Sequence, residues 1–203
     1  MNDLVIIKYN AGNIQSVVFA LERIGLKAEV TDDVQTIQSA DKVIFPGVGE
    51  ASSAMKYLKE RRLDEVIKGL RQPVLGICLG MQLMCKHSEE NNTDCMGIFD
   101  EEVVLFSPPV GGQDGIKVPQ IGWNNIHNFR SGLFSGVQEN SFVYLVHSYY
   151  AAIGKDTIAT TNYITQYSAA LQKNNFYGVQ FHPEKSANVG EQILKNFMLN
   201  AMG

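Results

Sequence analysis

The chain has 203 residues, of which 45% are hydrophobic and 19% are charged, with a formal net charge of -4 and a pI near 5.6. Such a chain can bury roughly 70% of its unfolded surface in one core, so we expect a single domain over residues 1–203. The scattered Lys and Arg residues provide no basic field, which excludes DNA and RNA as expected partners. The chain has no run of ~18 apolar residues and no basic leader, so we expect a cytoplasmic protein without a membrane partner.

In the first half of the chain, short apolar runs alternate with amphipathic segments. Leu4 to Ile7, Val43 to Phe45 and Val74 to Ile77 are hydrophobic on both faces, as strands covered by helices should be. From about Ser52 to Leu70, apolar residues recur near helical spacing, which predicts one helix. This alternation predicts an α/β fold with a doubly wound, mostly parallel sheet.

The second half is richer in strands than in helices. The strand candidates are Phe142 to Val146, Thr157 to Thr161, Ser168 to Leu171 and Tyr177 to Phe181. With little helix between them, they suggest antiparallel strands or hairpins added beside the main sheet. A final helix is predicted from about Val189 to Leu199, and the Pro- and Gly-rich stretch from Ser107 to Val118 predicts a surface loop.

The segment from Pro73 to Met84 is the strongest indication of chemistry. It begins as a buried strand, reaches Cys78 between Gly76 and Gly80, and continues with helical periodicity. This is the pattern of a nucleophile elbow, whose sharp strand-to-helix turn leaves no room for Cβ atoms at the two glycines. The helix N-terminus there would favour a thiolate over a thiol. The alternative is a buried structural cysteine at a strand end.

The other cysteines give no second chemistry. Cys85 and Cys95 bring the total to an odd number, and the chain has no Cys-x-x-Cys pair. Neither a disulfide framework nor a structural zinc site is expected, and Cys85 is interpreted as core filling.

A second motif places a histidine at a strand end with a carboxylate two residues later. Tyr177 to Phe181 leads into His182, Pro183 and Glu184, and the proline stiffens the spacing. A cysteine nucleophile needs a base for its own proton and an acid for the leaving amine, and a histidine held by a carboxylate provides both. The alternative is a capped strand end with an incidental histidine.

The remaining histidines are weaker candidates. His147 also lies at a predicted strand end and is the competing base, but no acidic residue is built into its turn. His87 and His127 lie in polar segments and are interpreted as solvated.

A Gly-rich loop, Phe45-Pro46-Gly47-Val48-Gly49, follows one buried strand and precedes a helix. Acyl transfer needs backbone N–H donors aimed at a developing oxyanion, and Val48 and Leu79 could supply them. An ordinary turn or a phosphate loop fits the loop equally well, although no Gly-Lys-Ser/Thr follows to make a Walker motif.

In this order and spacing, the cysteine elbow, the Pro-Gly-Val-Gly loop and the Phe-His-Pro-Glu segment resemble class I glutamine amidotransferases. The resemblance implies a Cys78–His182–Glu184 triad acting on glutamine, with neither cofactor nor metal. Further similarity at Tyr9 to Val17, Val118 to Asn124 and His147 to Tyr149 extends it over nearly the whole chain. It implies a glutamine pocket lined by Gly49, Gln82, Glu90, Ser148 and Tyr149.

These finer features resemble the family members that supply ammonia to a (β/α)₈-barrel cyclase in histidine biosynthesis. The resemblance implies a heterodimer, for which the expected contacts are Asn13, Gln120, Trp123 and Lys185, although Trp123 could equally be a core aromatic. Lys8 and Gln120 depart from the family pattern, which usually has Asp and His at these positions, so a paralogous synthase is an alternative acceptor. The same motifs would also fit a non-enzymatic scaffold, or a peptidase or γ-glutamyl hydrolase on the same fold.

Overall fold

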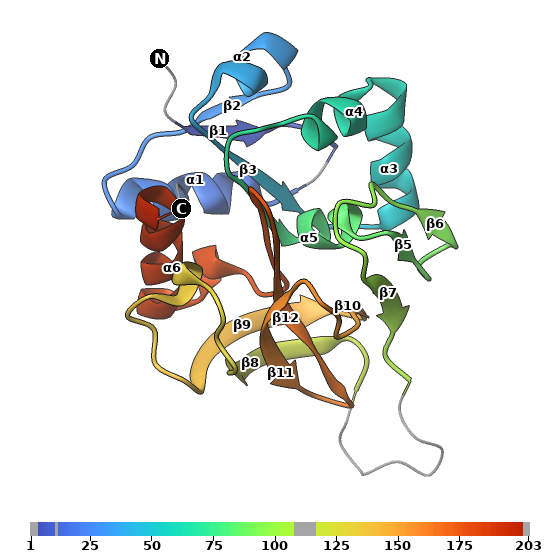
Figure 1. Ribbon diagram of the computed structural model, residues 1–203, viewed down its shortest axis with the longest axis vertical. Coiled ribbons are helices and arrows are strands. Elements are labelled where there is room, and N and C mark those ends of the chain that lie inside the picture. Colours follow the sequence, from blue (N-terminus) through green and yellow to red (C-terminus); the bar gives the residue numbers. More distant parts are fainter. Residues whose placement is uncertain (1–3, 11, 108–116, 201–203) are drawn as a thin grey trace.

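The computed structural model describes residues 4–10, 12–107 and 117–200 of the chain. Within these residues, the largest sheet has seven strands in the order β11-β12-β13-β4-β3-β1-β2 (Figure 1). These strands are β1 (Leu4–Ile7), β2 (Glu29–Thr31), β3 (Lys42–Gly47), β4 (Val74–Cys78), β11 (Thr157–Asn162), β12 (Gln166–Lys173) and β13 (Phe176–Val179). The five strands from β13 to β2 are parallel, whereas β12 and β11 continue the sheet antiparallel.

Helices cover both faces of this sheet because the side chains of each central strand alternate between two apolar cores. Val5 and Ile7 of β1 belong to one core, whereas Leu4 and Ile6 belong to the other. The first core packs under α2 (Val34–Ser39), α3 (Ala51–Glu60), α4 (Leu63–Lys68) and α5 (Leu79–Met84), and the second packs under α1 (Ile14–Arg23) and α6 (Ala187–Asn200). The predicted doubly wound α/β fold with added antiparallel strands is therefore confirmed.

Two smaller sheets lie at the carboxyl end of the parallel strands. One contains β10 (Tyr149–Ala151), β7 (Glu102–Leu105), β5 (His87–Ser88) and β6 (Thr93–Asp94), and the other pairs β8 (Gln120–Ile126) with β9 (Ser141–His147). Short 3-10 turns, η1 (Gly132–Phe134) and η2 (Pro183–Lys185), complete the elements. In Figure 1 the β8–β9 ribbon lies in the lower part of the view, below β1 and β3 and at the level of β11 and β12.

Two predicted elements need correction. The single helix predicted from Ser52 to Leu70 is two helices, because Arg62 adopts a left-handed conformation (φ 56°) between α3 and α4. Arg61 and Arg62 donate backbone hydrogen bonds to the last turn of α3, and the break lets Leu58 and Leu63 both reach the core.

The strand predicted from Tyr177 to Phe181 ends at Val179 and pairs in parallel with β4, so it belongs to the central sheet. The strand predicted from Phe142 to Val146 is confirmed within β9, which pairs antiparallel with β8 beside the main sheet. The helix predicted from Val189 to Leu199 is confirmed within α6, and most of the predicted loop from Ser107 to Val118 lies outside the described residues.

Candidate active site

Cys78 ends strand β4 and is the N-cap residue of helix α5, in a strained conformation with φ 53° and ψ −111°. The turn brings backbones together: a Cβ atom on Gly80 would lie 1.9 Å from the carbonyl oxygen of Phe45, and one on Gly76 would lie 2.9 Å from the carbonyl carbon of Gly80. Only glycine fits at such distances. The predicted elbow geometry is therefore confirmed, and it holds the Cys78 side chain at the carboxyl end of the sheet.

His182 and Glu184 lie next to this elbow because β13 is the parallel neighbour of β4. The Nδ1 atom of His182 is 2.7 Å from Oε1 of Glu184, and both side chains are only 1% exposed. Nδ1–H donates to the carboxylate, so the ring is fixed and Nε2 is left free for chemistry. Nε2 is enclosed and has no hydrogen-bond partner among the described residues.

The charge state of His182 follows from its surroundings. Burial by itself lowers the pKa of the imidazole, but the neighbouring Cys78 sulfur and the Glu184 carboxylate outweigh burial and raise the pKa to about 10. The imidazolium form is therefore favoured at neutral pH. A protonated imidazole beside the sulfur can give a proton to a leaving amine.

A cavity of about 310 Å³ opens above Cys78. It is lined by Val48, Gly49, Cys78, Leu79, Gln82, Glu90, Pro119, Val146, His147, Ser148, Tyr149 and His182. The structure thus brings together two residues of the predicted triad, both predicted oxyanion donors and all five predicted glutamine-binding residues. Glu184 lies behind His182. Pro119 and Val146 were not predicted, because nothing in the local pattern distinguishes them from ordinary loop and strand residues.

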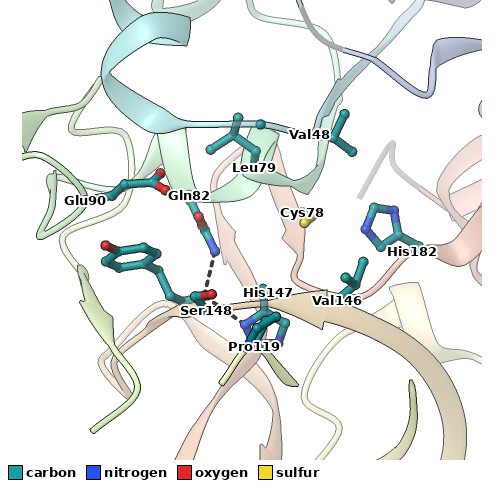
Figure 2. Close-up of a pocket in the computed structure, with 12 residues that line it drawn as sticks. Val48, Cys78, Leu79, Gln82, Glu90, Pro119, Val146, His147, Ser148 and His182 are labelled. Carbon is teal, nitrogen blue, oxygen red and sulfur yellow. Dashed lines mark hydrogen bonds between the residues drawn. The ribbon is translucent and has the colours of Figure 1, made fainter. Parts of the chain in front are cut away.

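The cavity has two chemically different ends. Figure 2 shows Cys78, Val48 and His182 at one end, whereas Glu90 lies at the other. Oε2 of Glu90 accepts a hydrogen bond of 2.7 Å from the backbone N–H of Ala51. Burial raises the pKa of Glu90, and this effect is larger than the lowering caused by the hydrogen bond from Ala51.

The competing histidine, His147, ends β9 on the same cavity but has neutral partners. Its Nδ1 lies 2.8 Å from the carbonyl oxygen of Tyr149, and its Nε2 lies 3.1 Å from the hydroxyl of Tyr167. Burial lowers the pKa of His147 to about 4. This imidazole is therefore neutral at pH 7 and engaged at both nitrogens.

The four residues predicted to contact a partner lie outside the cavity lining. The side chain of Asn13 donates a hydrogen bond of 2.7 Å to Oε1 of Glu184, which connects it to the predicted triad. Trp123 is 53% exposed, and Lys185 is exposed with its Nζ 5.8 Å from the centre of the Tyr144 ring.

The prediction that Gln120 contacts a partner needs correction. Its side chain is only 3% exposed, and Oε1 accepts a hydrogen bond of 2.8 Å from the hydroxyl of Tyr167. The fold turns this residue of β8 inward, so its side chain is not a surface contact. The departure of Gln120 from the family pattern therefore concerns the interior next to His147.

The interpretation of His87 and His127 as solvated also needs correction, because both are half-buried. Nδ1 of His87 lies 3.2 Å from Oδ1 of Asp94. Nδ1 of His127 is enclosed beside the backbone bridge to Thr160. Cys85, in contrast, is fully buried as predicted.

Two other kinds of feature are absent from the described residues. Across 4–10, 12–107 and 117–200, no three His, Cys, Asp or Glu side chains form a group that could hold a metal ion. No helix in the same part of the chain has both the length and the apolar character needed to cross a membrane.

Residues 5–201 match the family described as Glutamine amidotransferase class-I. The chain therefore belongs to the class I glutamine amidotransferases. Two solved structures share this fold: PurLQS from Thermotoga maritima (TM-score 0.70, 14% identity, 97% of this chain and 98% of that one) and a glutamine amidotransferase from the same organism (TM-score 0.63, 18% identity, 96% and 81%).

Within the family, the chain is similar to proteins named imidazole glycerol phosphate synthase subunit HisH. It is 57% identical to the one from Bacteroides fragilis and 56% identical to the one from Bacteroides thetaiotaomicron. Each match covers 96% of this chain and 98% of the relative. The resemblance that the motifs indicated is thus shown.

Proposed function

We propose that the protein is the glutaminase subunit of an imidazole glycerol phosphate synthase, hydrolysing glutamine to glutamate and ammonia. The observation that carries this proposal is the arrangement of the cavity: a cysteine elbow with a carboxylate-held histidine at one end and Glu90 at the other. A free amino acid bound with its ammonium group near Glu90 would extend its side-chain amide toward Cys78. The names of the relatives support the same assignment.

The chemistry follows from the charges at each atom. The Cys78 sulfur attacks the amide carbon, and the backbone N–H groups of Val48 and Leu79 stabilise the oxyanion. The imidazolium of His182 gives its proton to the amide nitrogen, ammonia leaves, and a γ-thioester forms on Cys78. His182, now neutral, takes a proton from water, which attacks the thioester and releases glutamate. Glu184 stabilises each imidazolium state through Nδ1.

The loop that carries Val48 is held on one side and free on the other. A Cβ atom on Gly47 would lie 2.8 Å from the backbone nitrogen of Gly80, so that residue is packed against the elbow. Gly49 has φ 110° and open space around it. The part of the loop beyond Gly47 can therefore change conformation without disturbing the elbow. Such a change would let the N–H of Val48 point at the oxyanion only when a partner with its ligand is bound.

The ammonia needs a protected route, because free ammonia is mostly protonated in water. An apolar surface adjoins the cavity: Ile121, Trp123 and Phe142 of the β8–β9 ribbon are 64%, 53% and 58% exposed, and Ile121 pairs with the cavity residue Val146. Exposed apolar patches of this kind mark protein interfaces. We place a (β/α)₈-barrel cyclase here, with Asn13, Trp123 and Lys185 among its contacts. It would use the ammonia to make imidazole glycerol phosphate and aminoimidazole carboxamide ribotide.

The test is glutamate release from glutamine by the protein alone and with a barrel cyclase and its nucleotide ligand. The expected result is strong stimulation by the loaded cyclase, abolished in Cys78→Ala and kept in the matched control Cys95→Ala, a half-buried cysteine outside the cavity. Hydrolysis that the cyclase leaves unchanged would contradict the partner assignment. Release that persists in Cys78→Ala would contradict the mechanism, and cleavage of γ-linked peptides without a partner would favour a γ-glutamyl hydrolase.

A further inference from the structure

Gln180 is a buried amide to which the proposed mechanism gives no role. It follows strand β13, is fully buried, and contacts the nucleophile itself: its Nε2 lies 3.7 Å from Sγ of Cys78 in a hydrogen bond to sulfur. Its Oε1 accepts a hydrogen bond of 2.9 Å from Nε2 of Gln82. Gln180 therefore joins the reacting atom to a residue of the glutamine pocket.

The orientation of this amide is fixed by a chain of hydrogen bonds. A carbonyl oxygen can only accept, so the carbonyl of Tyr149 requires Nε2 of Gln82 on its side, at 2.8 Å. The second hydrogen of that Nε2 then points to Gln180, which must present Oε1 to receive it. Nε2 of Gln180 is left facing the sulfur. The backbone of β10 thus aims an N–H group at Cys78 through two side chains.

A fixed N–H donor stabilises a thiolate more than a thiol, because a hydrogen bond to a charged acceptor is stronger than one to a neutral acceptor. This donor differs from His182 in that it carries no proton to transfer and no charge that changes with pH. The titratable side chains around Cys78 are His182, His147, Glu90 and Tyr149 on the cavity, Tyr9 and Tyr167 beside the elbow, and Glu184 behind His182. A substitution at Gln180 leaves all of these titratable side chains in the protein.

We propose that Gln180 is a catalytic residue whose N–H stabilises the Cys78 thiolate and holds the sulfur toward the cavity. The role rests on the proposed function in that the thiolate is the nucleophile of glutamine hydrolysis. Through Gln82, the same contact connects occupation of the glutamine pocket with the state of the sulfur.

The test measures the thiol directly. The rate at which iodoacetamide alkylates Cys78 is followed against pH, with the modified cysteine identified by mass spectrometry, in wild type, Gln180→Met and Gln180→Leu. Methionine keeps the length of the side chain but donates no N–H. Leucine also lacks a donor and adds no charge, and it serves as the second variant if Gln180→Met does not fold. Gln166→Met, at an exposed position of β12, is the matched control, and Cys78→Ala gives the background.

The expected result is that loss of the donor raises the midpoint of the alkylation profile by about one pH unit or more, so that the rate at pH 7 falls about ten-fold. Gln166→Met is expected to leave the midpoint in place. A folded variant whose midpoint matches that of wild type would overturn the proposal, as would a wild-type Cys78 that is alkylated only as fast as an ordinary thiol. Glutamate release assayed in parallel separates the two claims: a shifted midpoint in a protein that never releases glutamate would refute the proposed function alone.

Discussion

His182 and His147 line the same cavity from neighbouring elements, yet their pKa values move in opposite directions from 6.5, to about 10 and about 4. Burial lowers both. The difference lies in the partners: His182 has a carboxylate and a sulfur, whereas His147 has a carbonyl oxygen and a phenol. The imidazole of His182 is therefore a cation that can donate a proton, whereas the imidazole of His147 is neutral and only lines the cavity. In the proposed mechanism, the carboxylate two residues away makes His182, and not His147, the acid.

Replacing each histidine by asparagine gives the largest contrast. Asparagine can reproduce the Nδ1–H donor but cannot carry a proton on Nε2. We expect His182→Asn to lower kcat/KM for glutamate release by about 10³-fold or more, and His147→Asn to lower it less than about 10-fold. Steady-state kinetics of both folded variants in the presence of the activating partner measure this difference. Equal losses would show that the two imidazoles share the proton transfer.

Removing the charge but not the hydrogen bond at Glu184 tests the cause of the contrast. Glu184→Gln should lower the pKa of His182, because the negative charge that favours the imidazolium is gone. We expect kcat/KM to fall about 10²-fold and the alkaline fall of the pH–rate profile to move to lower pH. If the alkaline limb stays in place, whatever the change in kcat/KM, Glu184 does not set the pKa of His182.

A substitution at Asn13 tests how much its hydrogen bond to the Glu184 carboxylate contributes. Its side chain donates to the same Oε1 of Glu184 that His182 uses, across 171 positions of sequence. We expect Asn13→Ala to lower kcat by less than about 10-fold, since it loosens the carboxylate without removing it. Gln15→Ala, an exposed change two residues away, is the control and should be neutral. A partner-binding loss without a change in kcat would assign Asn13 to the interface instead.

The pKa shifts of His182 and His147 also predict how the free energy of unfolding depends on pH, and the two contributions have opposite signs. At about 1.4 kcal/mol per pKa unit, each contribution is a few kcal/mol at most. The raised pKa of His182 stabilises the fold below pH 6.5, and that stabilisation is lost as the pH rises through about 10. The lowered pKa of His147 stabilises it above pH 6.5, and that stabilisation is lost as the pH falls through about 4.

Urea denaturation at pH 4, 7 and 10 measures both limbs. His182→Asn should flatten the alkaline limb and His147→Asn the acid limb, because each variant lacks one titrating group. A variant that flattens neither limb, or the wrong one, would contradict the assignment of that shift.

The elements of this fold that could be predicted from sequence are those fixed by neighbouring residues. The spacing of Gly76, Cys78 and Gly80 specifies the elbow, because the close backbone approach involves only a strand and the helix that follows it. The stretch from His182 to Glu184 is similarly local. Hydrophobic patterning likewise identified β1, β3, β4 and α6, whose apolar faces repeat within a few residues.

The features that could not be predicted depend on residues far apart in the chain. The pairing of Gln82 with Gln180 spans 98 positions, and the burial of Gln120 depends on Tyr167 across 47. The break at Arg62 was also unpredictable, because neither Gly nor Pro marks it. In each case, packing against distant elements outweighs the local pattern.

The backbone at Cys78 has a further consequence for how this protein can change over time. A non-glycine residue at φ 53° and ψ −111° costs about 1–3 kcal/mol. Glycine would adopt this conformation without that cost, which offsets the packing contacts that the buried Cys78 side chain would lose in Cys78→Gly. Selection for heat resistance alone would therefore give little protection to the proposed nucleophile. In a lineage that keeps Cys78, selection for the proposed reaction, rather than for stability, retains this residue.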